Sequence, residues 1–234
     1  MNIPHSLFSR LIPALAVLAV LATFAFAGGS SQIIQKENQA CQVGNPNAPQ
    51  GTVSGIFNGH EAYAYYVYPP AQCDCQESGF KLENVSQGLS FDETQVPAVL
   101  NVSPLLIKAE REANQPYFVP GPILYEGPTQ TITVDEAGPV LVTVPTDNIE
   151  AFPFDDHYFI GLRYEGDAPG NLQIDDEPLP GIEYILTPNG WSDLYRWRKR
   201  AGGGKVIVYG DIVCSPMGSP TESRTWDTIK SLYR

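Results

Sequence analysis

Two short runs of carboxylates are the residues best suited to binding a cation. Asp155 and Asp156 stand directly before a stretch that reads as a strand, and Asp175 and Asp176 lie in a loop bounded by prolines. Oxygen-rich loops of this kind can bind Ca²⁺. The alternative is that these carboxylates cap turns and solvate loops in an acidic protein. Because neither run matches the spacing of an EF-hand loop, the second interpretation is favoured, and we expect no cofactor, with Ca²⁺ kept as a possibility at these carboxylates.

Aromatic residues gather on two predicted strands and are the best clue to a ligand site. They are Tyr63, Tyr65, Tyr66 and Tyr68 on the first strand, and Trp191, Tyr195 and Trp197 on the second. Rings with an apolar body and a polar tip suit stacking on sugar rings. Such residues also fill the cores of β-sandwiches. Since Trp191, Tyr195 and Trp197 share one face of a strand, the core interpretation is favoured and the glycan interpretation is kept beside it.

Four cysteines follow the N-terminal apolar segment, and an even number in an exported chain favours disulfides. They are Cys41, Cys73, Cys75 and Cys214. A Cys73–Cys75 bond would close a very tight ring, so we expect each of these two to bond Cys41 or Cys214, in either order. The alternative is a four-thiolate zinc site, which the spacing disfavours because it lacks paired short motifs.

Catalytic motifs are absent from the sequence. There is no nucleophile elbow, no His-Glu-x-x-His, no P-loop and no dinucleotide fingerprint, and the only histidines after residue 27 are His60 and His157. A pair of carboxylates acting on glycosidic bonds stays open, because the two members of such a pair can be far apart in sequence. An enzyme is therefore the less favoured class.

The first 27 residues have the layout of a secretory signal peptide. Arg10 precedes an apolar run, and Ala25-Phe26-Ala27 places small residues before a cut at Gly28. An uncleaved membrane anchor is the alternative, although the run is short for a spanning helix. Losing Arg10 changes the formal charge from −12 to −13. Such a charge disfavours nucleic acid as a partner. From the signal-peptide pattern we expect a secreted, periplasmic or cell-surface protein with no transmembrane segment in the mature chain.

The remaining chain predicts an all-β fold, a jelly-roll-like antiparallel β-sandwich at residues 51–214. Short segments rich in Val, Ile, Tyr and Phe are separated by 21 Gly and 21 Pro residues. Residues 190–214 predict a hairpin that closes the domain, and the turn at 135–139 predicts another. Residues 157–164 predict a half-buried strand with Tyr158, Ile160, Leu162 and Tyr164 on one face. A short helix is allowed only at 105–113, although 105–107 can also extend a strand.

The ends of the chain are expected to lie outside the sandwich. Residues 28–50 are a polar lead-in that becomes ordered near Cys41, and residues 215–234 are a linker with an amphipathic tail. The tail either docks on its own domain or is read by a partner or by export machinery. Asn84 and Asn101 each begin an N-glycosylation pattern, which matters only in a host that uses it.

The end of the domain resembles a known group of folds. Gly190-Trp191-Ser192-Asp193-Leu194, a glycine turn and the strand from Val206 to Ile212 are similar to the final strands of jelly-roll domains in exported bacterial proteins. Those domains are related to carbohydrate-binding and galactose-binding-like modules. The resemblance covers residues 180–214, carries no ligand residue with it, and implies a binding or accessory role.

We therefore expect an exported, disulfide-bonded, non-catalytic protein that binds a glycan or a cell-surface protein. The alternatives are a secreted hydrolase that acts on polysaccharide through acidic residues, and a structural subunit of the cell envelope.

Overall fold

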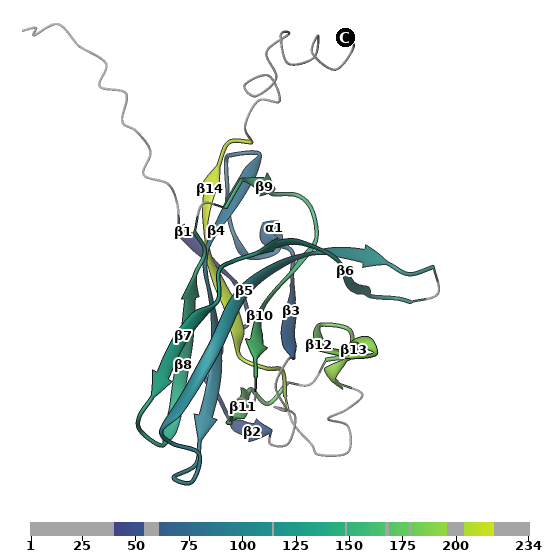
Figure 1. Ribbon diagram of the computed structural model, residues 1–234. Helices are drawn as coiled ribbons and strands as arrows, with labels where there is room; N and C mark the ends of the chain where they lie inside the picture. Colours follow the sequence, from purple (N-terminus) through teal and green to yellow (C-terminus); the bar gives the residue numbers. More distant parts are fainter. Residues whose placement is uncertain are drawn as a thin grey trace, which may run out of the picture. The chain divides into compact units, whose positions relative to one another are not determined.

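Two antiparallel sheets pack face to face as a β-sandwich, which confirms the predicted fold class (Figure 1). The computed structural model describes residues 40–53, 61–113, 115–147, 149–166, 169–177, 179–195 and 204–217. All of these lie in one unit, Lys36–Arg234. The predicted signal peptide and the tail after Met217 lie outside the described residues. No helix among the described residues is long and apolar enough to cross a membrane.

The first sheet, sheet A, is built around one long strand, β4. Its strands in spatial order are β1 (Ala40–Gly44), β14 (Val208–Ser215), β4 (Gly79–Phe91), β11 (Asn171–Ile174) and β2 (Gly51–Val53), with β8 (Gly138–Pro145) and β9 (Phe152–Pro153) also paired to β4. Sheet A begins at Ala40, so its first strand lies inside the segment that the sequence assigned to the lead-in.

The second sheet, sheet B, contains the other long strand, β5. Its order is β13 (Gly190–Asp193), β12 (Glu183–Thr187), β3 (Ala62–Val67), β10 (Tyr158–Glu165), β5 (Ala98–Arg111) and β6 (Phe118–Glu126), with β7 (Gln130–Val134) also paired to β5. A four-residue helix, α1 (Pro69–Gln72), follows β3.

The core lies between the two sheets, and β10 shows how the sequence pattern creates it. Tyr158, Ile160, Leu162 and Tyr164 all join the core cluster, as their alternation predicts. Phe159 points to the opposite face and is buried there too, so the prediction that this strand is only half-buried is wrong. Burying side chains of this size contributes about 1.5–3 kcal/mol each.

Sheet B is therefore packed on both faces at its centre, although Val99 of β5 is 55% exposed. A second apolar cluster covers its outer face, and its buried members are Ala62, Ala64, Leu105, Ile107, Ala109, Phe159 and Tyr184. The short helix allowed at 105–113 does not form, because β5 continues as a strand to Arg111, and the alternative that 105–107 extends a strand is confirmed. A strand buried on both faces reads as a continuous apolar run, and such a run does not distinguish strand from helix.

The hairpin predicted at 190–214 is also wrong, although a strand lies near each end of this range. The strand β13 pairs with β12, whereas β14 pairs with β1 and β4 in the other sheet. Gly190, with φ 98°, closes a tight turn from Thr187, so the local hairpin forms upstream of the predicted one. Alternating residues predict a strand but not its partner.

The turn at 135–139 joins sheets instead of closing a hairpin. The strand β7 pairs with β5 in sheet B, and β8 pairs with β4 in sheet A. This hairpin prediction is therefore wrong.

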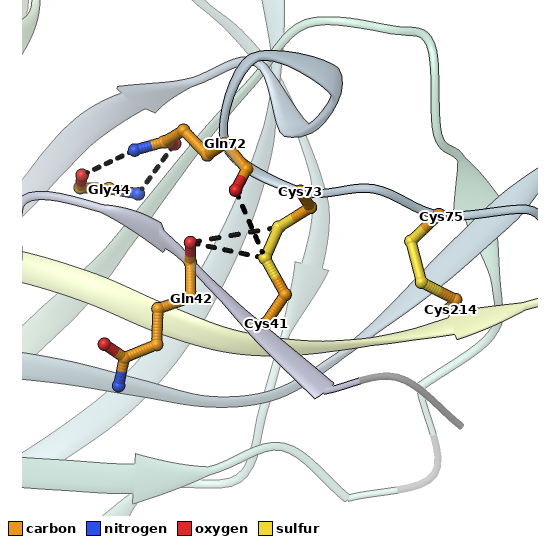
Figure 2. The surroundings of a disulfide bond; sticks show 7 residues. All are labelled: Cys41, Gln42, Gly44, Gln72, Cys73, Cys75 and Cys214. Atoms are coloured by element: carbon orange, nitrogen blue, oxygen red, sulfur yellow. Dashed lines mark hydrogen bonds between the residues drawn. A yellow bond between two sulfur atoms is a disulfide. The ribbon is translucent and has the colours of Figure 1, made fainter. Parts of the chain in front are cut away.

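The disulfides pair Cys41 with Cys73 and Cys75 with Cys214, one of the two orders that the sequence left open (Figure 2). No cysteine is free, so no thiolate remains for the alternative zinc site. The loop-entropy relation assigns roughly 4 kcal/mol to the bond with sequence separation 32 and roughly 5 kcal/mol to the bond with separation 139.

Candidate functional site

A cavity of about 260 Å³ lies against the outer face of sheet B and is the best candidate for a ligand site. It opens between the end of the β5–β6 hairpin and the β12–β13 hairpin, which lie on the same side of the domain (Figure 1). The lining residues combine rings with hydrogen-bonding groups and are Glu112, Gln115, Tyr117, Val119, Tyr184, Trp191, Ser192 and Asp193. A concave site with apolar rings and a few polar groups is the usual form of a small-ligand site.

The β12–β13 pair positions one wall of this cavity. Tyr184 and Asp193 are register partners on neighbouring strands, and Trp191 lies two residues before Asp193. Partners across a ladder, and residues two apart on a strand, project from the same face of a sheet. The tight turn that ends at Gly190 thus determines that these three side chains line the cavity together.

Tyr184 also forms the floor of the cavity. It is only 4% exposed, its ring meets the Phe159 ring edge-on at 5.3 Å, and its hydroxyl donates a 3.0 Å hydrogen bond to the carbonyl oxygen of Phe118. Phe118 pairs with Arg111 at the end of the β5–β6 hairpin. This hydrogen bond therefore ties the two walls of the cavity together.

The opposite wall depends on a glycine. The Tyr117 ring lies so close to Gly181 that a β-carbon there would stand 2.3 Å from Tyr117 Cγ. Gly181 also has φ +73°, a conformation that residues with a β-carbon rarely adopt. The glycine allows Tyr117 to lie over the segment that leads into β12.

The carboxylates in the lining differ in their surroundings. Asp193 is 8% exposed, and its Oδ1 accepts a 2.9 Å hydrogen bond from the backbone N–H of Tyr195. Glu112 is exposed at the rim. The cavity thus contains a buried, hydrogen-bonded carboxylate, Asp193, and a solvent-exposed carboxylate, Glu112.

A line of stacked rings continues from the cavity across the outer face of sheet B. His157 lies between Phe118 and Tyr68, with ring centroids 4.2 and 4.5 Å away, and its Nδ1 is 2.6 Å from the Tyr66 hydroxyl. The Arg111 guanidinium stands 4.9 Å above the Phe118 ring. Burial raises the pKa of the Tyr66 hydroxyl, so Tyr66 stays protonated at neutral pH.

The six predicted ligand residues fall in different places. Trp191 lines the cavity and Tyr66 joins the ring stack, whereas Tyr63 and Tyr65 are 0% and 7% exposed and pack in the core between the sheets. Burial is the largest cause that raises the pKa of Tyr63. The Glu61 carboxylate, which accepts a hydrogen bond from the Tyr63 hydroxyl, raises this pKa further. Tyr195 is half-buried beyond the end of β13, and Trp197 lies outside the described residues.

Neither of the two aspartate pairs proposed for calcium lies, among the described residues, in a cluster of three or more side chains arranged to hold a metal ion. Asp155 and Asp176 are exposed, and Asp156 Oδ1 accepts a 2.8 Å hydrogen bond from the backbone of His157. Within the part of the chain that the structure describes, no group of three or more His, Cys, Asp or Glu side chains has an arrangement suited to a metal ion.

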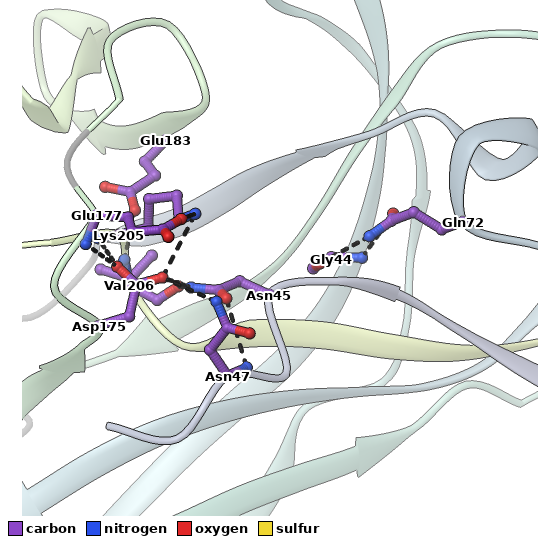
Figure 3. A network of polar contacts seen from close by, with 9 residues as sticks. All are labelled: Gly44, Asn45, Asn47, Gln72, Asp175, Glu177, Glu183, Lys205 and Val206. Carbon is purple, nitrogen blue, oxygen red and sulfur yellow. Dashed lines mark hydrogen bonds and ion pairs between the residues drawn. The ribbon is translucent and has the colours of Figure 1, made fainter. Parts of the chain in front are cut away.

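Asp175 is the centre of a buried polar network (Figure 3). Its Oδ2 accepts hydrogen bonds from Asn45 (3.0 Å) and Asn47 (3.2 Å), and its Oδ1 accepts from the backbone of Glu177 (3.0 Å) and Lys205 (2.6 Å). Burial alone would raise the pKa of Asp175, but these donors together hold it below its ordinary value. A carboxylate that accepts this many hydrogen bonds from neighbouring segments stabilises the fold.

The same network reaches the element that forms the cavity wall. Glu183 of β12 is fully buried, and its Oε1 accepts a hydrogen bond from the backbone N–H of Val206. Asn45 donates to the carbonyl oxygen of Val206 at 2.9 Å. Sheet A is thereby joined to β12 through polar contacts, which fixes the base of the β12–β13 hairpin.

Sequence reasoning missed most of the cavity lining. Glu112, Gln115 and Tyr117 belong to a hairpin end that becomes visible only once β5 is known to continue as a strand to Arg111. Tyr184 lies in β12, and nothing in the sequence around it indicates that its face of sheet B is covered.

Comparisons of this chain with protein-family models, with curated proteins and with solved structures give no significant match.

Proposed function

We propose that this chain is an exported, non-catalytic binding protein that holds a carbohydrate in the cavity between the β5–β6 and β12–β13 hairpins. The observation that carries the proposal is the lining itself, in which the rings of Tyr117, Tyr184 and Trp191 stand beside polar side chains. The faces of sugar rings are apolar and pack against aromatic rings, while their hydroxyls donate to carboxylate and amide oxygens. A cavity that combines both kinds of group suits a sugar better than a purely apolar ligand.

Two features support export. All four cysteines are bonded, which is typical of oxidising compartments. The N-terminal pattern of the sequence matches a signal peptide. The excess of acidic residues is compatible with export, because it disfavours anionic partners such as nucleic acid.

The first experiment is a glycan array probed with the mature chain, followed by titration calorimetry of any bound glycan. Recovery of the glycan unchanged after binding is expected. If no array member and no cell-wall polysaccharide binds at millimolar concentration, the proposal fails.

A second candidate is a secreted glycoside hydrolase, favoured by the presence of two carboxylates, Glu112 and Asp193, in one cavity. Hydrolysis of glycosidic bonds commonly uses such a pair as acid and as base or nucleophile. A hydrolase would release reducing ends from the bound glycan, and Glu112→Gln would abolish that release without preventing binding. A binding protein would release none in either form.

A further inference from the structure

The four cysteines join the two ends of the domain covalently. Cys41, in the first strand of sheet A, is bonded to Cys73, and Cys214, near the end of β14, is bonded to Cys75. Only Asp74 separates Cys73 from Cys75. A continuous covalent path therefore runs from Cys41 to Cys214 through two disulfides and three residues, and Figure 2 shows the two bonds side by side.

This path is short because the chain enters and leaves the sandwich at the same place. Ala40 and Val213 are register partners in the antiparallel β1–β14 pair. Opposite pulls on the two flanking segments would load this rung first and would then open the pair one rung at a time. Each backbone hydrogen bond contributes only about 1 kcal/mol net, so the rungs alone would resist weakly.

We infer that the two disulfides act as a clasp that carries tension between the segments flanking the domain, so that the sandwich beyond its first rung bears none of it. The Cα atoms are 6.0 Å apart in the first bond and 5.6 Å apart in the second. Residues 73–75 span about 7 Å at most when extended. The roughly 170 residues between Cys41 and Cys214 would span about 560–610 Å when stretched, so the clasp becomes taut long before they do.

The clasp also divides the domain into two covalently closed loops. One loop runs from Cys41 to Cys73 and the other from Cys75 to Cys214, which contains the whole cavity lining. A cut in either loop leaves the two flanking segments joined. A binding protein of this design keeps its cavity intact when its two ends are pulled apart.

The test is to hold the full exported chain by handles ligated at its two ends and to record its extension under rising force. The oxidised protein is expected to give no extension step from the domain. The paired variant Cys41→Ser, Cys73→Ser releases only the loop of separation 32, and Cys75→Ser, Cys214→Ser releases the loop of separation 139. At 3.3–3.6 Å per residue, these steps are about 110 Å and about 480 Å.

The lengths do not depend on whether the variants fold, because the remaining disulfide alone limits how far the chain can be stretched. A long extension step in the oxidised wild-type chain, or equal maximum lengths in the two variants, would overturn the inference. Limited proteolysis supplies a second readout. Cleavage within 76–213 should leave the intact mass increased only by water until a reductant separates the fragments, whereas fragments that separate without reductant would contradict it.

Discussion

The Tyr117 ring lies directly over Gly181, where a β-carbon would stand 2.3 Å from Tyr117 Cγ. Tyr117 belongs to the β5–β6 hairpin end and Gly181 to the segment before β12, so this contact joins the two walls of the cavity. The ring and the glycine form a tight pair that only a residue without a β-carbon permits.

Substitution Gly181→Ala should therefore displace Tyr117 as well as strain the backbone. A positive φ costs a residue with a β-carbon about 1–2 kcal/mol, and the clash adds to this. Gly166→Ala is the matched control, because Gly166 has φ +78° and nothing within 4 Å of the added carbon. We expect Gly181→Ala to lose more unfolding free energy than Gly166→Ala in urea and to weaken glycan binding, which Gly166→Ala should preserve. Equal losses would show that the contact is unimportant.

Asp175 should stabilise the fold only when it is ionised. Its pKa in the folded protein lies below the ordinary value of 3.8, so its contribution is present above that pH and is lost as the pH falls through the folded value. Asp175→Asn removes the charge that accepts from Asn45, Asn47 and Lys205 and should cost about 1.5–3 kcal/mol at pH 7. Denaturant unfolding of both proteins between pH 3 and pH 7 gives the difference. If the unfolding free energy that Asp175→Asn loses relative to the wild type became larger as the pH falls, the result would contradict this account.

The outer face of sheet B should be as sensitive to truncation as the core. Leu106 faces the core between the sheets, and Ile107 faces the second cluster, yet both are 0% exposed. Leu106→Ala and Ile107→Ala should each cost about 2–5 kcal/mol, because each leaves a cavity in packed surroundings. Lys108, which is exposed, is the control, and Lys108→Ala should stay within about 0.5 kcal/mol of the wild type. An Ile107→Ala variant as stable as Lys108→Ala would show that the outer face is not a packed layer.

The two disulfides should contribute unequally to stability. Removing the bond of separation 139 by Cys75→Ser with Cys214→Ser should cost roughly 1 kcal/mol more than removing the bond of separation 32, since the longer loop restrains the unfolded chain more. Thermal unfolding of the two paired variants, compared with the oxidised wild type, measures this order. The reverse order would mean that native contacts around Cys41 and Cys73 outweigh the entropic effect of the longer loop on the unfolded chain.

Local features of the fold could be predicted from the sequence, whereas the choice of which strands pair with one another could not. The alternation from Tyr158 to Tyr164 identified both the strand and its core face, and the chemistry of the Cys73-Asp74-Cys75 motif restricted the disulfides to two orders. Pairing between distant strands is set by tertiary contacts, so the pattern around Val208 predicted a strand while giving it the wrong neighbour.

The candidate site shows the same division. Trp191 was identified because large aromatic residues on a strand are conspicuous, and it does line the cavity. Tyr63 has the same chemistry but faces the core, since its side of β3 meets the other sheet. Glu112 and Tyr117 come together with Tyr184 only because the fold places two hairpins side by side, which no spacing in the sequence encodes.

The central claim is that the cavity beside Trp191 binds a glycan, and affinity measurements on two variants test it most directly. Trp191→Ala removes a ring of the lining, whereas Tyr209→Ala removes a half-buried ring from sheet A, away from the cavity. Titration calorimetry with the best glycan from the array should show a loss of at least tenfold in affinity for Trp191→Ala, about 1.4 kcal/mol, and little change for Tyr209→Ala. Unchanged affinity in a folded Trp191→Ala protein would contradict the account.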